Sequence, residues 1–166
     1  VTAFDDPDIT HTYATAGQHT VTIDGLLEAI RFEDITPANQ QLIAIPNLGH
    51  VGWVTLSYAF QSCEQLTTVA GGDTSQVTTM QSMFNGATLA TPDTSGWDTS
   101  SVTNMGHLVY QATSANPDTS GGDTSRGTHM SGTVGGTTQA DPDTSGPRPP
   151  RLRNTGRTDT DPPAAN

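Results

Sequence analysis

The chain has 166 residues, of which only 32% are hydrophobic and 5% aromatic, and its formal net charge is −11. Burial of apolar groups must offset the entropy of ordering the backbone. A chain with so few apolar residues is therefore not expected to fold as a fully compact globule. The chain contains no lysine, and four of its six arginines lie near the C-terminus, so its acidic body excludes a nucleic-acid surface and docking on anionic lipid.

The N-terminal residues 1–24 carry a strand signal. From Thr20 to Asp24 polar and apolar residues alternate, which predicts a half-buried strand. The longer run His11–Ile23, HTYATAGQHTVTI, resembles the closing hairpin of a β-sandwich of the polycystic-kidney-disease (PKD) type. This resemblance predicts a PKD-like closing hairpin over residues 1–24.

Residues 25–72 are expected to form an N-terminal cap and a first, divergent repeat. Ala29–Phe32 and Leu42–Ile45 are strand candidates, and a proline closes the second of them. Trp53–Phe60 carries apolar residues at the spacing of a short amphipathic helix. Cys63 is the single cysteine of the chain, so it has no partner for an intrachain disulfide and is expected to be a buried, inert thiol.

Internal repetition with a constant period begins at Asp73. The triplet Asp-Thr-Ser starts at residues 73, 98 and 123, and methionines stand at 80, 105 and 130. Pro-Asp-Thr-Ser-Gly starts at residues 92, 117 and 142. These features recur every 25 residues. A repeat unit of this length is typical of leucine-rich and related solenoid repeats. We expect residues 73–146 to hold three such units, the third of them degenerate because glycines dilute its interior.

Each unit combines a turn with an apolar face. The Pro-Asp-Thr-Ser-Gly run is turn chemistry. Several apolar residues are spaced so that they would lie on one face of a helix, which predicts a short helix here. They are Val77, Met80, Met83, Phe84 and Ala87. Such a unit cannot bury its apolar face alone, and stacking on neighbours supplies the missing surface. The predicted fold class is α/β, a short leucine-rich-repeat-like solenoid of about 25-residue units with a β-rich N-terminal segment. The composition of residues 147–166 predicts a disordered C-terminal tail.

Two segments of the repeat region resemble a known family. Trp97–Met105, WDTSSVTNM, is similar to the repeat of the BspA-type leucine-rich-repeat surface proteins, W-D-x-S-x-V-x-x-M. Ala59–Leu66, AFQSCEQL, resembles the A-F-x-x-C-x-x-L segment that precedes those repeats. The resemblance covers about residues 53–146 and implies an extracellular protein of adhesion or cell–cell contact. Large apolar residues of the family pattern are replaced here at Gly72, Gly122, Thr94, Thr119 and Thr144.

No catalytic residue is predicted, because nothing resembles a metal-binding histidine pair, a nucleophile elbow, a phosphate-binding loop or a dinucleotide fingerprint. The weak candidates for a metal site are carboxylates: Asp5, Asp6, Asp8, Asp73, Asp98 and Asp123. Their oxygens suit calcium, and a ladder of like charges repels itself unless a cation lies between its rungs. Turn and cap roles explain every one of these aspartates as well. No other cofactor is predicted.

These features predict a non-catalytic, secreted or cell-surface repeat protein of adhesion or protein–protein interaction. Its partner would be a protein or glycan on another surface, without nucleic acid and without direct membrane insertion, because no stretch is apolar enough to span a bilayer. The alternative is a calcium-stabilised structural stalk or matrix protein. A row of aligned threonines, Thr74, Thr99 and Thr124, would suit an ordered surface such as ice, although solvated turns use threonine too.

Overall fold

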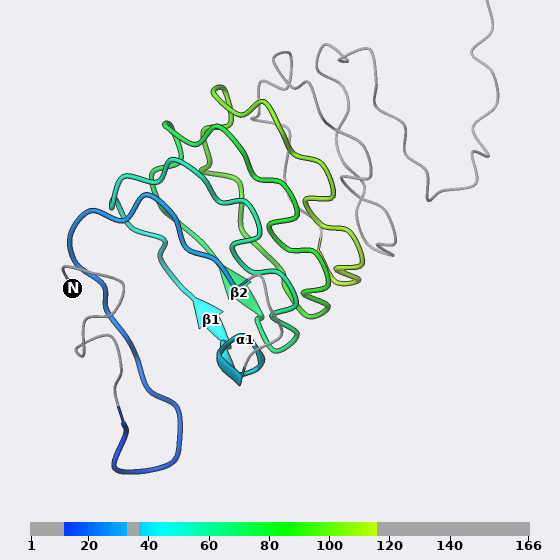
Figure 1. The fold of residues 1–166 in the computed structure, drawn as a ribbon. Helices are drawn as coiled ribbons and strands as arrows, with labels where there is room; N and C mark the ends of the chain where they lie inside the picture. Colours follow the sequence, from blue (N-terminus) through cyan, green and yellow to red (C-terminus); the bar gives the residue numbers. More distant parts are fainter. Residues whose placement is uncertain (1–11, 33–36, 116–166) are drawn as a thin grey trace, which may run out of the picture.

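Regular elements are few and short in the computed structural model, which describes residues 12–32 and 37–115. In this part of the chain α1 spans Pro37–Gln41, β1 spans Ala44–Ile45 and β2 spans Thr68–Val69. β1 and β2 form a parallel pair. Figure 1 shows the described chain from residue 27 on, apart from these elements, as irregular coils stacked side by side.

Single parallel bridges join successive coils at one point of each turn. Ala29 pairs with Thr55, Thr55 with Thr79, and Thr79 with Asn104, so each bridge joins positions one repeat apart. In the β1–β2 pair Ala44 faces its partner Thr68, which is again one repeat further along the chain. The bridges define a first coil whose described residues are 27–32 and 37–52, a second over 53–76, a third over 77–101, and the described part of a fourth over 102–115.

Backbone hydrogen bonds alternate in direction along the coils. In the third coil the N–H groups of Met80, Ser82, Phe84 and Gly86 donate to carbonyls of the fourth coil at 2.8–2.9 Å. The N–H groups between them donate back along the same coil, as Met83 does to the carbonyl of Met80 at 3.3 Å. Every N–H from residue 82 to residue 87 is therefore paired, although no α-helix or strand is present there.

This alternation replaces the short helix predicted over Val77–Ala87, and that prediction is wrong. Residues 81–86 form turns whose bonds span three residues instead of four. Ser82 and Gly86 have φ of 53° and 74°, which a right-handed helix does not permit. The helix predicted over Trp53–Phe60 is wrong for the same reason. Each turn returns the chain to the interior after three or four residues, so the apolar spacing looks helical.

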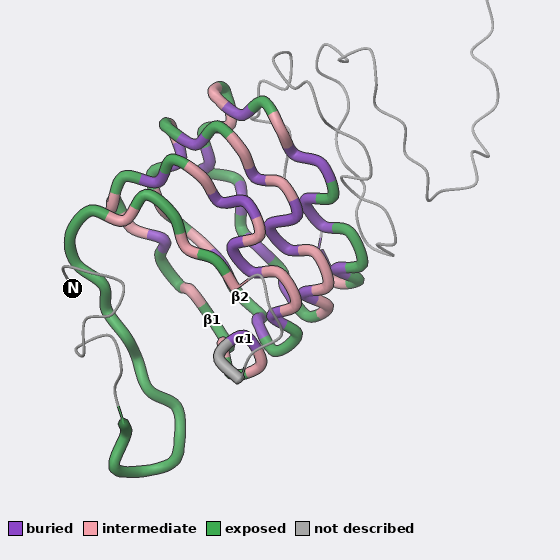
Figure 2. The backbone as a smooth tube through the Cα atoms, viewed as in Figure 1, coloured by how far each residue is buried: buried purple, intermediate pink, exposed green. Residues whose placement is uncertain are grey.

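The interior is formed by apolar side chains at equivalent positions of adjacent coils. Met80 and Met105 are both buried, and Met80 N–H donates to the residue just before Met105. The Phe60 and Phe84 ring centroids lie 5.6 Å apart, and Phe84 stacks on Trp97 at 6.4 Å. Figure 2 shows buried residues recurring from coil to coil. The third predicted unit, with its methionine at 130, and the tail over 147–166 lie outside the described residues.

The segment that precedes the first coil is exposed (Figure 2). The strand predicted over Thr20–Asp24 is wrong, because Val21 and Ile23 are 69% and 55% exposed and residues 12–24 contain no strand. An alternating pattern forms a strand only where another strand pairs with it, and no other segment of the described chain pairs with this one.

The other strand candidates are confirmed only in small part. Ala29 makes one isolated bridge, and the following residues up to 32 are not a strand. Of Leu42–Ile45 the last two residues form β1. The helix α1, which the sequence pattern did not indicate, precedes β1 and buries Asn39 completely.

Threonine side chains reinforce the bonds between coils. Thr67 donates both its N–H and its hydroxyl to Ile43 O, at 2.8 and 3.0 Å, and Thr91 does the same to Thr67 O, at 2.8 and 2.9 Å. A second row behaves alike, because Thr78 and Thr103 each use both donors on one carbonyl of the preceding coil. Threonine therefore ties the coils together in a chain that has few apolar residues.

Candidate functional site

The acidic metal candidates serve as turn acceptors where the structure describes them. Asp73 and Asp98 are exposed, and each Oδ1 accepts an N–H from two residues later, Ser75 at 3.0 Å and Ser100 at 2.9 Å. Among the described residues no three His, Cys, Asp or Glu are grouped to hold a metal ion. The remaining candidates lie outside the described residues: Asp5, Asp6, Asp8 and Asp123. Calcium binding therefore stays a prediction.

The turn bonds also set the acidity of these two carboxyl groups. Hydrogen bonds from Ser75 and Ser100 favour the charged carboxylate and hold the pKa of Asp73 and of Asp98 below its ordinary value. A group whose pKa is lowered by folding stabilises the fold fully above its unfolded pKa, near 3.8. That contribution disappears as the pH falls through the lower pKa of the folded state.

When the pH is lowered from about 6 to about 2.5, we expect the melting temperature of the double variant Asp73→Asn, Asp98→Asn to fall less than that of the parent chain. An amide oxygen still accepts the serine N–H bond but does not titrate in this range. The change is small, because both side chains are exposed to solvent. Thermal melts followed by circular dichroism measure it, and the double variant Glu28→Gln, Glu64→Gln controls for the removal of two negative charges, because both glutamates are exposed. Equal losses in parent and double variant would contradict the turn role.

The threonine row considered for an ordered surface is not an open face. Thr74 is buried, and its hydroxyl donates to Asp98 O at 3.0 Å. Thr99 is half-buried, and Thr124 lies outside the described residues. Thr74 therefore joins its coil to the next one, and the Thr99 hydroxyl oxygen is buried without a hydrogen-bond partner, so neither forms an open threonine face.

Two positions in the second, third and fourth coils hold a left-handed backbone conformation. The first position has φ of 60°, 53° and 57°, at Tyr58, Ser82 and His107. The second position, four residues later, has φ of 56°, 74° and 58°, at Ser62, Gly86 and Gln111. Because the conformation recurs at the coil spacing, the fold imposes it whatever the side chain. A residue other than glycine costs about 1–2 kcal/mol there, and a bulky one such as tyrosine is a genuine outlier.

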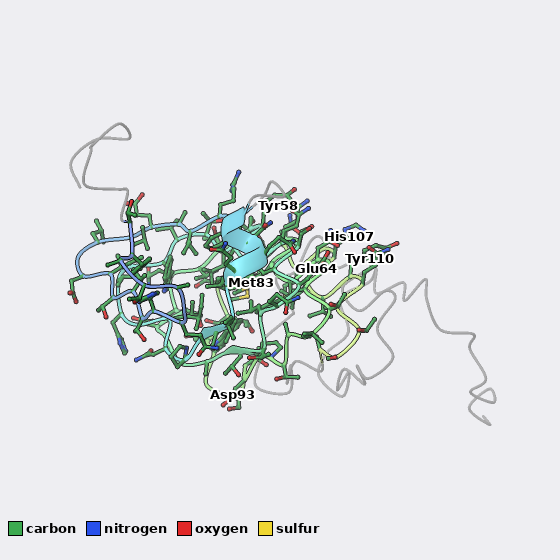
Figure 3. The ribbon with its side chains drawn as sticks, turned by 90° about the horizontal axis from the view of Figure 1, so that it is seen from below. Tyr58, Glu64, Met83, Asp93, His107 and Tyr110 are labelled. Carbon is green, nitrogen blue, oxygen red and sulfur yellow. The ribbon has the colours of Figure 1, made fainter. Side chains whose placement is uncertain are left out.

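Side chains at the first left-handed position share one side of the molecule with Tyr110. Arg31 lies over the Tyr58 ring, with Cζ 5.5 Å from the ring centroid. His107 meets Tyr110 edge to face, with centroids 5.4 Å apart and an interplanar angle of 82°. Figure 3 shows Tyr58, His107 and Tyr110 on the side opposite Asp93. We define the aromatic face by the residues Arg31, Tyr58, Ser82, His107 and Tyr110.

A hydrogen-bonded row of polar side chains holds the backbone just before the aromatic face. Ser57 Oγ and Thr79 Oγ1 are 2.9 Å apart and connect the second coil to the third. Asn104 Nδ2 donates to Gln81 Oε1 at 3.1 Å and connects the third coil to the fourth. Each left-handed residue of the aromatic face thus follows directly on a chain segment that is tied to a neighbouring coil, which limits its motion.

Cys63 is completely buried among core side chains, as predicted, and burial raises the pKa of its thiol to about 12. The thiolate is the reactive form, so this thiol is a poor nucleophile. We expect iodoacetamide at about pH 8 to leave Cys63 unmodified in the native chain and to modify it fully in denaturant. Mass spectrometry of the intact chain measures both, and rapid labelling without denaturant would contradict the buried position.

Sequence reasoning missed the aromatic face. The equivalence of Tyr58, Ser82 and His107 becomes visible only when the repeat alignment is extended back into the second coil, where the spacing differs by one residue from that of the later repeats. The three residue types share no property that a pattern would reveal. Glycine favours positive φ, and Gly86 is the one sign in the sequence that a left-handed position recurs here.

The described coils, stacked in parallel and joined by side-chain and backbone bonds, define a repeat protein. The chain belongs to the family described as "Mycoplasma protein of unknown function, DUF285", whose model matches residues 32–146. The matched region begins at residue 32 and so leaves out the N-terminal residues 1–24. No curated protein and no solved structure matches the chain. Within the described part, no helix is long and apolar enough to cross a membrane.

Proposed function

We propose that the chain is a non-catalytic binding part of a secreted or cell-surface protein, related to the BspA-type repeats and arranged as a short leucine-rich-repeat-type solenoid. It would attach to a protein or glycan on another surface. Support for the repeat character comes from the family match over residues 32–146 and from the parallel bridges between coils. The observation that carries the binding role is the aromatic face.

Aromatic residues are scarce in this chain, at 5%, and their placement is uneven. The phenylalanines and tryptophans of the second and third coils are buried, whereas Tyr110 and His107 are exposed and Tyr58 is half-exposed. Tyrosine and arginine are the residue types that most often anchor binding surfaces, because a ring contributes large contact area with little entropy loss. A surface with Arg31 and two tyrosines on stacked coils therefore favours recognition of a partner.

Bead attachment tests the binding role. Fluorescent beads carrying the 166-residue chain are washed over glass coated with purified extracellular glycoproteins, before and after enzymatic deglycosylation. We expect attachment to at least one coat, and none by beads that carry the heat-unfolded chain. Attachment to no coat at saturating bead density would overturn the proposal.

A calcium-stabilised stalk is the second candidate. Asp73 and Asp98 occupy equivalent places in the repeat, and the charge of Asp73 disfavours the charged form of Asp98. A cation between them would relieve this repulsion. Thermal melting with added calcium separates the two functions, because a ligand of the native state raises the melting temperature. A rise that magnesium does not reproduce would favour the stalk, and an unchanged melting temperature would exclude it.

A further inference from the structure

The left-handed positions of the aromatic face carry side chains that folding does not require. Glycine fits such a position best, and the chain itself uses Gly86 at the second left-handed position and the small Ser82 at the first. At equivalent places stand Tyr58 and His107, both large rings. Because the coil imposes this conformation and a small residue satisfies it at Ser82, folding does not account for the two large rings, which are free to serve recognition.

The two rings stand on either side of a small, buried residue. Neighbouring coils are about 4.8 Å apart where their backbones are bonded, so the Tyr58 and His107 backbones are about 10 Å apart, with Ser82 between them. Ser82 is only 5% exposed. Arg31 lies over the Tyr58 ring, and Tyr110 lies against the His107 ring. A backbone spacing of about 10 Å leaves room for one saturated ring-shaped group between two aromatic side chains that stand out from these backbones.

Neutral hydrogen-bonding groups flank the rings. Asn85 is half-buried and stands at the position equivalent to Tyr110 and to Gln61. Gln61 Oε1 is buried and has no hydrogen-bond partner. A hydroxyl donor that reached this amide after a side-chain rotation would satisfy an acceptor that is costly to leave unpaired. Hydroxyl groups on a saturated ring are the chemistry of a sugar.

Charge and backbone pairing argue against the other partners. The aromatic face contains no carboxylate, but the whole chain carries a net charge of −11, which repels an anionic polymer. An extended peptide would need free backbone donors and acceptors to add as a strand. Here Tyr58 N–H and Ser82 N–H already donate to the next coil at 2.9 Å. We propose that the aromatic face binds a neutral glycan, with one pyranose ring between Tyr58 and His107. This inference rests on the proposed binding function.

A glycan array probed with the full chain tests the proposal. The array carries neutral oligomers of glucose, galactose, mannose and N-acetylglucosamine beside sialylated and sulfated glycans. We expect binding to a neutral oligomer, and a loss of at least about tenfold in Tyr58→Ser and in His107→Ser. Serine fits this backbone, as Ser82 shows, so both melting temperatures should stay within about 4 °C of the parent.

Two further variants separate recognition from folding. Gln111→Ser makes the matching change at the second left-handed position, where Ser62 is the precedent, and should leave binding unchanged. Tyr58→Phe keeps the ring and should retain binding within about threefold. Binding that survives both serine variants would place the site elsewhere and overturn the inference. Binding only to anionic glycans would overturn it too. Beads that attach to deglycosylated protein while the array stays blank would overturn the glycan partner and leave the binding function standing.

Discussion

Replacing Phe84 by alanine is expected to destabilise the chain by about 3–5 kcal/mol, a large part of the stability of a small protein. Phe84 is completely buried, and its ring lies 5.6 Å from Phe60 in the second coil and 6.4 Å from Trp97 in its own coil. The coils on both sides are tied by hydrogen bonds, which restricts their collapse into the cavity. Because stacked units stabilise one another, loss of this contact weakens more than one coil.

Chemical denaturation followed by tryptophan fluorescence measures the effect of Phe84→Ala. Leu89→Ala is the matched control, because Leu89 belongs to the same coil and is 48% exposed. This exposed change should alter the free energy of unfolding by no more than about 0.5 kcal/mol. A loss below about 1 kcal/mol for Phe84→Ala would mean that the stacked rings do not hold the second and third coils together.

Replacing Gly72 by alanine is expected to cost about 2–4 kcal/mol, for two separate reasons. Gly72 has φ of +94°, which side chains rarely adopt. A Cβ atom there would also lie 2.6 Å from Leu48 Cβ and 3.4 Å from Gly49 O, so the first coil would have to move away. Both effects act on the contact between the first and second coils.

Gly96→Ala provides the control for Gly72→Ala. A Cβ atom at Gly96 would meet nothing within 4 Å, and its φ lies outside the left-handed region. We expect a change between zero and a gain of about 0.5 kcal/mol, since alanine lowers the entropy of the unfolded chain. Thermal melts of both variants give the comparison. Equal melting temperatures for Gly72→Ala and Gly96→Ala would contradict the close approach of Leu48.

The same contact explains one departure from the BspA-type pattern. That pattern has tryptophan where this chain has Gly72, as it does at Trp97. Leu48 is buried against Gly72 and leaves no room for a side chain. The glycine therefore accommodates a residue of the preceding coil, and it need not weaken the interior. The other glycine at such a place, Gly122, lies outside the described residues.

The interior of the coils could be predicted from the sequence, but their local conformation could not. The buried positions of Met80, Met83 and Phe84 follow from apolar spacing alone. The bonds that set the conformation join residues one whole coil apart, as from Phe84 N to Leu108 O. A single window of sequence contains only one of the two partners. Local spacing therefore suggested a helix, whereas in the structure the N–H groups donate alternately within a turn and to the next coil.

At the candidate site, the sequence predicted the role of the aspartates but not the role of the aromatic side chains. The turn role of Asp73 and Asp98 follows from the Asp-Thr-Ser triplet, because a short acidic side chain commonly accepts the N–H two residues on. Tyr58 and His107 carry no such signal. Their importance depends on a positive φ that the coil imposes, and neither residue type reveals it.

The alternating direction of the backbone bonds has a consequence for mechanical load. Bonds such as Ser82 N to Gly106 O run along the stack, whereas the chain itself winds around it. Tension applied through the two chain ends would load the outermost coil first and open its bonds a few at a time, as in peeling. Each opened coil would then release about 80–90 Å of slack, the extended length of one repeat. Under tension such a chain would unfold one coil at a time, and the extension of each opened coil would relieve the force while the remaining coils stay folded.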